Sequence, residues 1–411
     1  MYYQTLEELY IPEEDPYFDD GLTMLKKVDK KTIEKRQLFL DQLLEEAYRL
    51  TGNEYEGKSN DTSTNRLIFG TRWWPSGTIS IFDEVAGRNV PVVGAKILIR
   101  QWFTVRQAIT NENGYFKTSS VRGSARYIIQ WERYDYSIRN GSLFQAELRG
   151  PERKQQDWNY TINAGSGDSD DKYHALIHQA AHDYYYGHRF GLISPPRNGF
   201  FSVQMKIAAR EVAGVSYHVH TPSELTFGLY PRVVVKQWGS AADKVYGTTI
   251  HELTHAAHSV LDRINYDLLV KDAFFGDFSA AIRNRNRRLL ETWPTTVEIV
   301  MALDRYKTKF GVSNYEYGIV GNIINSGNRQ FFSILDDNHY TSAGYDMLDY
   351  FNQRSFGYGY PVDNVSGYNI NQLQGALIGA SSWNEWRDNI KNRNNNPTEI
   401  YLDELFNNWQ D

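Results

Sequence analysis

The chain has 411 residues and not one of them is cysteine. Disulfide bonds are therefore excluded, and so are thiolate ligands for a zinc ion. A zinc site in this protein would have to be built from histidine and carboxylate side chains. The lack of cysteine does not by itself indicate an oxidising or a reducing compartment.

Long apolar runs and excess positive charge are also missing. No apolar stretch approaches 18 residues, which excludes a helix that spans a membrane. The first residues, Met-Tyr-Tyr-Gln, do not resemble a signal peptide. The formal net charge is −6, so we expect no nucleic-acid partner. Aromatic residues are abundant instead, at 14%, which suits large cores as well as surfaces that contact sugars or peptides.

We predict an α+β, multidomain protein with three parts. An apolar stripe over residues 23–50 indicates a helix, so residues 1–77 are expected to form an N-terminal helical support segment. Apolar residues then alternate with a period of two, which predicts a small β-sandwich over residues 78–150. Residues 151–411 are expected to form a mostly helical domain with a short β-sheet, and the candidate site residues lie in this domain.

The most informative motif is a short segment that starts at Tyr246 and reads Tyr-Gly-Thr-Thr-Ile-His-Glu-Leu-Thr-His-Ala-Ala-His. On a helix, His251 and His255 lie on one face, one turn apart. This spacing lets two imidazoles bind one Zn²⁺ while Glu252 reaches a water on the metal. The alternative is a core helix whose histidines only satisfy hydrogen bonds, but an intact Glu252 has no use in a purely structural site.

A catalytic zinc takes three protein ligands, so one ligand is still missing. His258 lies about 10 Å along the helix axis from His251, too far for one straight helix to supply all three. We therefore expect His258 to pack near the site. The segment over residues 289–303 is the obvious donor, because it carries Glu291 and Glu298. Asp262 is a lesser candidate.

This combination resembles the gluzincins, which are HExxH zinc peptidases with a glutamate as third ligand on a following helix. The run Glu291-Thr-Trp-Pro-Thr-Thr-Val-Glu298 is similar to the Asn-Glu-Gly-Phe-Ala-x-x-x-Glu run of their aminopeptidase branch. The resemblance implies that Glu291 binds the metal and that Glu298 supports it. We expect Pro294 in the first helical turn; Glu291 would then precede the helix, which keeps Glu298 open as the ligand. The Gly-x-Met-Glu-Asn signature of aminopeptidases is absent.

The resemblance implies a zinc-dependent peptidase that acts on a peptide or protein substrate with Glu252 as general base. In gluzincins a further tyrosine or histidine stabilises the oxyanion. Tyr315, Tyr317, His339, Tyr340 and Tyr345 follow the glutamate segment, no spacing rule selects one, and we name Tyr340 and Tyr345. Two alternatives stay open: a zinc-containing surface protein that binds peptide or glycan with little or no activity, and a zinc amidase that acts on a non-peptide amide. The sequence leaves the oligomeric state open.

A β-strand is expected beside such a site to pair with an extended substrate. The β-branched segment over residues 231–238 suits this edge strand, with residues 217–220 as its neighbour. His218 and His220 are expected to be surface residues, or strand residues with satisfied hydrogen bonds, rather than a second metal site. A separate histidine stripe, formed by His174, His178 and His182, spans about 12 Å on a helix and is expected to be packing.

The segments Pro91-Val-Val-Gly-Ala-Lys-Ile-Leu-Ile99 and Ile109-Thr-Asn-Glu-Asn-Gly-Tyr-Phe116 resemble the carboxypeptidase regulatory-like domain, a transthyretin-like β-sandwich. Asn111 stands where that family has Asp, which a turn tolerates. The order of this domain and the peptidase motif resembles surface metallopeptidase lipoproteins of Bacteroidetes. This implies a cell-surface or periplasmic location, with membrane attachment only through a lipid anchor that is missing from this chain.

Overall fold

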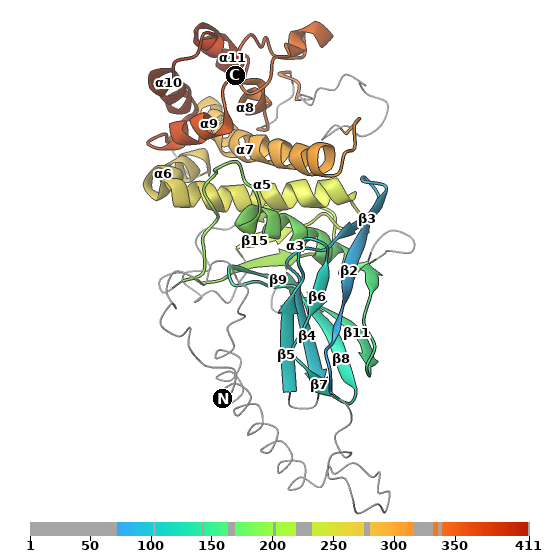
Figure 1. Ribbon diagram of the computed structural model, residues 1–411. Helices are drawn as coiled ribbons and strands as arrows, with labels where there is room; N and C mark the ends of the chain where they lie inside the picture. Colours follow the sequence, from blue (N-terminus) through green and yellow to red (C-terminus); the bar gives the residue numbers. More distant parts are fainter. Residues whose placement is uncertain are drawn as a thin grey trace, which may run out of the picture.

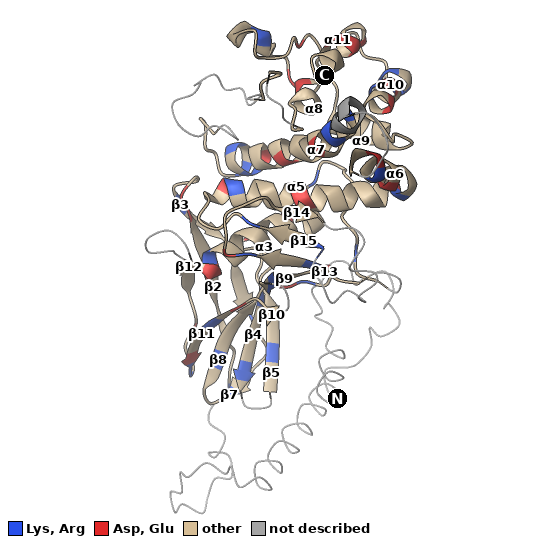
Figure 2. Cartoon of the chain, turned by 180° about the vertical axis from the view of Figure 1, so that it is seen from behind, with Lys and Arg blue, Asp and Glu red and all other residues tan. Residues whose placement is uncertain are grey.

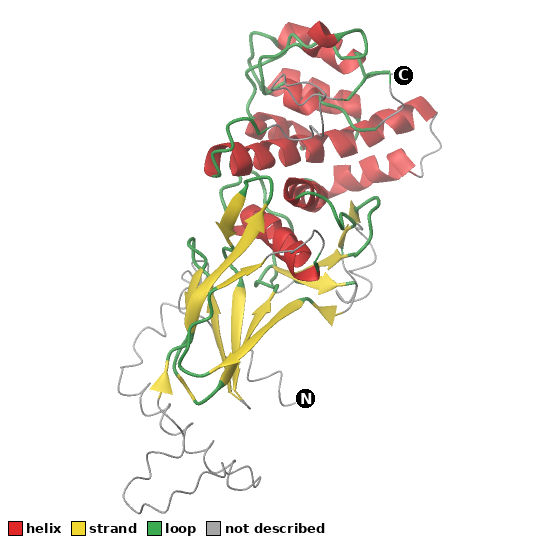
Figure 3. Ribbon diagram, turned by 90° about the vertical axis from the view of Figure 1, so that its right-hand side faces the viewer, coloured by secondary structure: helices red, strands yellow, loops and turns green. Residues whose placement is uncertain are grey.

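The computed structural model describes residues 72–101, 104–141, 144–162, 169–199, 203–218, 232–274, 280–315, 332–335 and 339–409. The expected support segment, with its helix over residues 23–50, lies outside them except for residues 72–77. The described chain has a mixed α+β structure, with strands at one end and helices stacked on the other (Figures 1 and 3). This confirms the predicted α+β class. Within the described residues, no helix is long and apolar enough to cross a membrane.

Two sheets form the strand-rich end of the molecule. One contains β12 (Tyr160–Ile162), β2 (Ser76–Asp83), β3 (Arg88–Pro91) and, paired to β2, β6 (Tyr115–Lys117). The other runs in the order β11 (Glu147–Arg153), β8 (Ala125–Gln130), β4 (Lys96–Gln101) and β5 (Thr104–Ile109). A short pair, β1 (Arg72–Trp73) and β7 (Val121–Arg122), lies at the far end.

The core between these sheets follows the predicted alternation. Ile79 and Ile81 of β2 are fully buried, and so are Ile97 and Ile99 of β4. Tyr127 of β8 makes an edge-on ring contact across the core with a phenylalanine of β6, at 6.0 Å between centroids. Every second side chain of β2 thus faces the opposite sheet, as the period of two requires.

The turn that resembles the regulatory-like domain has a clear local cause. The Asn111 side chain accepts hydrogen bonds from the backbone N–H groups of Asn113 and Tyr115, both at 3.0 Å. Gly114 has a φ of +71°, which a residue with a Cβ rarely adopts. Asn111 therefore takes the place of the Asp that the regulatory-like family has in this turn.

A third, mixed sheet lies between the two facing sheets and the helices. Its order is β10 (Phe144–Gln145), β9 (Tyr136–Asn140), β13 (Met205–Ala209), β15 (Val233–Val235) and β14 (Tyr217–His218). β15 pairs parallel to β13 on one side and antiparallel to β14 on the other. The expectation that residues 231–238 form the edge strand is therefore wrong: among the described strands, β14 is at the edge.

This sheet joins residues on both sides of position 150, because β9 pairs in parallel with β13. β12, which also follows residue 150, pairs with β2. The division into parts 78–150 and 151–411 stays a prediction.

The helices cover the mixed sheet in layers. α3 (Asp170–Tyr186) begins at Ser169, whose hydroxyl accepts the backbone N–H of Lys172. α5 (Ala242–Leu261) packs against α3 on one side and α7 (Ala280–Leu303) on the other, and α6 (Arg263–Phe274) lies beside α7. A π-helix, η1 (Asp304–Lys309), follows α7. The C-terminal elements are α8 (Ala343–Asp346), η2 (Gln353–Phe356), α9 (Ile370–Leu377), α10 (Trp383–Arg393), η3 (Glu399–Tyr401) and α11 (Leu402–Asn407).

Pro294 lies in the interior of α7, so the expectation that it stands in the first turn is wrong. The preceding segment is rich in Ala, Arg and Leu, which favour helix, so the helix begins well upstream of the proline. A proline at this depth removes the bond to the carbonyl of Leu290. Glu291 is consequently a helical residue rather than one that precedes the helix.

A buried polar network joins the facing sheets to the helices. Arg305 of η1 donates to Asp183 of α3 at 2.9 Å and to the Gln179 side chain at 2.6 Å. Tyr246 of α5 donates to the same Asp183 carboxylate at 3.0 Å. The next residue of η1, Tyr306, donates to Asp83 at the end of β2, at 3.1 Å. These hydrogen bonds therefore join η1, α3 and α5 to one another and, through Tyr306, connect them to β2.

Candidate metal centre

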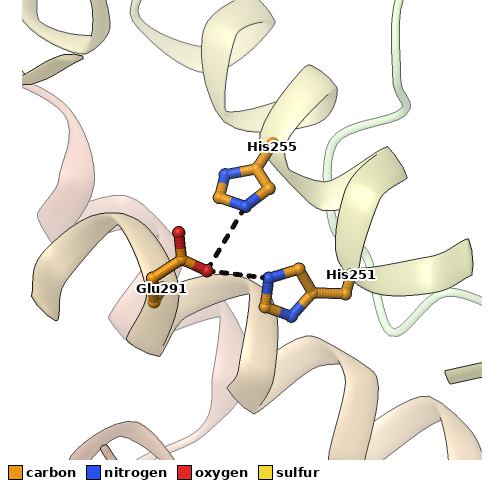
Figure 4. Close-up of side chains that lie close together, drawn as sticks. All are labelled: His251, His255 and Glu291. Atoms are coloured by element: carbon orange, nitrogen blue, oxygen red, sulfur yellow. Dashed lines mark hydrogen bonds and ion pairs between the residues drawn. The ribbon is translucent and has the colours of Figure 1, made fainter. Parts of the chain in front are cut away.

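The two motif histidines lie in the middle of α5, on the side that faces α7. α5 is apolar around them, and its residues from Val245 to Ser259 are all buried. The rings of His251 and His255 are 5.0 Å apart, as expected for residues one helical turn apart. Figure 4 shows both rings directed toward α7.

α7 brings Glu291 to these rings. Its Oε2 atom lies 3.1 Å from Nε2 of His251 and 3.7 Å from Nε2 of His255 (Figure 4). Ligand atoms of all three residues lie within 4.8 Å of one another, and no other such group of His, Cys, Asp or Glu occurs in the described part of the chain. The structure thus brings together the three residues that the sequence nominated as metal ligands.

Glu298 occupies a different position. Its Oε2 atom lies 3.0 Å from Nδ1 of His251, the ring nitrogen that points away from Glu291. Glu291 and Glu298 are the acidic residues of α7, which Figure 2 marks in red on this helix. A carboxylate on the far nitrogen fixes the orientation of an imidazole and leaves the near nitrogen free to bind a metal.

The donor set fits zinc. Nitrogen and oxygen ligands lie about 2.1 Å from zinc, which puts the ligand atoms of one tetrahedral ion about 3.4 Å apart. The two distances from Glu291, 3.1 and 3.7 Å, bracket that spacing. The site also favours positive charge: burial lowers the pKa of His251, but hydrogen bonds to Glu291 and Glu298 outweigh burial and raise it to about 10. Burial opposes the ionised form of Glu291, but the two histidines hold its pKa well below the usual range.

Glu252 is buried beside the histidines and is only 5% exposed. Burial raises the pKa of its carboxyl to about 7, against the opposing effect of the two histidines. Among the described residues, no side chain or backbone group forms a hydrogen bond or ion pair with this carboxylate. A buried carboxylate without a partner is costly, and such groups concentrate at functional sites.

The two candidate tyrosines differ in their surroundings. The Tyr340 ring lies 5.9 Å from that of His251, and its hydroxyl is close to the Glu291 carboxylate. Burial and the negative charge of Glu291 raise the pKa of this hydroxyl above its usual value. Tyr345 lies in α8 and packs against the hydrophobic core. Of the two, Tyr340 is the residue in contact with the metal centre.

The segment that carries Tyr340 is held on α7 next to the ligand. The hydroxyls of Thr341 and Thr292 lie 2.7 Å apart, and Thr292 directly follows Glu291. At Gly344 an added Cβ would lie 1.9 Å from the Thr296 hydroxyl, so only glycine allows this approach to the helix. Sequence reasoning did not detect this contact, because neither threonine belongs to a recognisable pattern.

His218 also lies closer to the centre than its expected surface position suggested. It belongs to the edge strand β14, and its ring is nearly parallel to that of His255, with 6.4 Å between centroids and 6° between planes. His220 lies outside the described residues. The sequence feature that could have indicated this proximity is the position of His218 in the segment expected to be next to the site.

The other candidates have structural partners. His258 is buried against Tyr266, with ring centroids 4.9 Å apart, and burial lowers its pKa to about 3. His178 contacts the Tyr136 hydroxyl and the carbonyl of Val93, both at 3.0 Å. Asp262 accepts the backbone N–H of Gly379 at 2.7 Å. These residues have structural contacts, and none of them belongs to the group formed by His251, His255 and Glu291.

Comparison with known proteins finds no matching family model, no matching curated protein and no matching solved structure. The family resemblances therefore rest on sequence motifs and their order alone, and the function must be argued from the geometry of the centre.

Proposed function

We propose that this protein is a zinc-dependent peptidase in which His251, His255 and Glu291 hold the metal and Glu252 is the general base. One observation carries the proposal: three ligand atoms from two packed helices converge within 4.8 Å. The buried carboxylate of Glu252, which has no hydrogen-bond or ion-pair partner among the described residues, adjoins them. A catalytic centre needs such a group, whereas a structural metal site does not.

A bound zinc ion would supply Lewis acidity and a water molecule of lowered pKa. The protein would supply the rest. Glu298 holds His251 with Nε2 toward the metal position. Glu252 would accept a proton from the attacking water and deliver it to the leaving amine. Tyr340, whose hydroxyl lies close to Glu291, would donate to the oxyanion as it forms.

The surroundings support a peptide as substrate. Within the described residues, β14 is the outer strand of the mixed sheet and contacts α5. An edge strand can pair with an extended peptide, which a small non-peptide amide does not require. The mixed sheet, α5 and α7 are consistent with the expected zincin-like domain, and the two facing sheets with the expected β-sandwich.

The function is tested with the purified protein and a mixed library of unstructured peptides. We expect about one equivalent of zinc per chain by mass spectrometry of metals, as three protein ligands imply. Peptide cleavage should stop when a chelator removes the metal and should return when zinc is added back. Zinc-loaded protein that binds peptides but cleaves none would contradict the proposal and favour the peptide- or glycan-binding alternative.

The change Tyr340→Phe removes the hydroxyl beside Glu291 and keeps the ring. Loss of one oxyanion donor typically costs about 10²–10³-fold in kcat, so we expect a fall of that order with the zinc content unchanged. Steady-state kinetics on a peptide found in the library measures it. Tyr345→Phe is the matched control and should keep kcat near the wild-type value. The opposite ranking would transfer the catalytic role to Tyr345.

A further inference from the structure

The first half of α7 carries a run of basic residues that the proposed reaction does not use. Arg288 is buried and donates a hydrogen bond to the backbone carbonyl of Trp409. Arg285 and Arg287 are partly buried, and neither forms an ion pair with an Asp or Glu among the described residues. A partly buried guanidinium without an anionic partner is a candidate for binding an anion from outside the chain.

Arg287 lies on the same face of α7 as the proposed ligand Glu291. It precedes Glu291 by four residues, which is one helical turn and about 6 Å along the axis. Its Nη1 atom lies 3.4 Å from Nε2 of His339, the residue before Tyr340. The Tyr340 ring in turn lies 5.9 Å from that of His251. Helix geometry and this contact thus place Arg287 next to the centre, toward the segment that carries Tyr340.

A carbonyl and an aromatic ring hold the Arg287 side chain in place. Its Nε atom donates a hydrogen bond to the backbone carbonyl of Ala273 in α6, at 3.0 Å. The guanidinium lies over the ring of Phe274, 4.8 Å from the centroid. These contacts orient the guanidinium without neutralising it, and its Nη2 atom makes no hydrogen bond with a described residue. An oriented guanidinium with N–H groups to spare suits a carboxylate, which can accept two parallel hydrogen bonds.

The distance between Arg287 and the centre suits a carboxylate that belongs to the substrate. An extended peptide advances by about 3.3–3.6 Å per residue. If its scissile carbonyl lies at the metal position, a carboxylate about one to three residues away comes within range of a side chain one helical turn from Glu291. The anionic groups of an unmodified peptide are its C-terminal carboxylate and the side chains of Asp and Glu.

We propose that Arg287 is a specificity-determining residue that binds a carboxylate of the substrate near the scissile bond. The inference rests on the proposed peptidase and names its substrates, which are peptides cleaved close to a free C-terminus or close to an acidic side chain. Both sources present the same group to the guanidinium. A neutral group in this place would leave the partly buried charge of Arg287 without a partner, and this cost disfavours its binding.

The test uses the full-length, zinc-loaded Glu252→Gln protein on a resin, because this variant is expected to bind peptides without cleaving them. The mixed peptide library is applied in two forms, one with free C-terminal carboxylates and one with C-terminal amides. Mass spectrometry quantifies the retained peptides. Recognition of the C-terminus should give about 10-fold or more retention of the free acid over the amide. Recognition of a side chain should give a similar preference for Asp and Glu over Asn and Gln within the amidated form.

Arg287→Gln, introduced into the same protein, should abolish the preference. Arg287→Lys should restore part of it, because the charge returns without the planar fork of donors. Arg285→Gln is the matched control: it removes the same charge two residues away, about 200° around α7, and should keep the preference. Circular dichroism and zinc content show whether each variant is folded.

Two outcomes would overturn the proposal. One is that carboxylate-bearing peptides are retained no better than their neutral counterparts in either arm, or that no peptide is retained at all. The other is a folded Arg287→Gln protein with an unchanged preference. The readout is binding, so its failure is distinguishable from failure of the proposed function. A wild-type protein that selects carboxylate peptides through Arg287 but cleaves none would contradict the peptidase and leave carboxylate recognition in place.

Discussion

Replacing Glu252 by Gln is expected to lower kcat by about 10²–10⁴-fold while zinc stays bound, because this range is typical for loss of a general base. Glutamine preserves the size of the side chain and removes its basicity. Glu252 is buried beside the histidines but does not belong to the group of three ligand residues. The loss should therefore appear in kcat rather than in the metal content, with KM little changed.

The measurement combines steady-state cleavage of one identified peptide with metal analysis of the same preparations. Glu112→Gln is a suitable control, because this exposed glutamate lies in the turn that Asn111 organises among the strands. It should behave as the wild type. Equal cleavage rates for Glu252→Gln and wild type would mean that the reaction does not use the centre on α5 and α7.

Changing Glu291 to Ala is expected to abolish stoichiometric zinc binding, whereas Glu298→Ala should weaken it without abolishing it. Glu291 contributes the carboxylate oxygen between the two Nε2 atoms, so its loss leaves a two-histidine site. Glu298 contacts the opposite nitrogen of His251. Loss of such a supporting carboxylate typically costs about 10–100-fold in metal affinity.

Zinc titration against a competing chelator distinguishes the two variants, and circular dichroism shows whether each is folded. Glu291→Gln provides a milder replacement in case Ala at the buried position disturbs α7. Full zinc retention in Glu291→Ala together with loss in Glu298→Ala would reverse the two roles. It would then be Glu298 that binds the metal.

The parts of the centre that depend on local geometry could be read from the sequence. His251 and His255 face one side because helical periodicity fixes them, and Glu252 accompanies them. The position of Glu291 needed tertiary information, since the long segment between α5 and α7 gives no register. Pro294 suggested a helix start, but the helix-favouring residues before it extend α7 upstream.

The order of the strands in the mixed sheet was harder to predict than which residues share one face of a helix. The residues of β15 have the β-branched content of any buried strand, and composition does not tell an edge strand from an inner one. The short strand β14 takes the edge instead and brings His218 to His255. Tyr340 could be nominated but not selected from sequence, because its contact with Glu291 depends on the Thr341–Thr292 pair across a large gap in sequence.

The network around Arg305 has a consequence for folding cooperativity. Arg305 is 5% exposed and is neutralised by Asp183, while the neighbouring Tyr306 contacts Asp83 at the end of β2. If the facing sheets opened, Tyr306 would lose its partner and water would reach a charged pair buried under α5. Opening of the sheets would therefore also break a contact of η1, and this contact connects the helices that include His251 and His255 to strands that contribute no ligand.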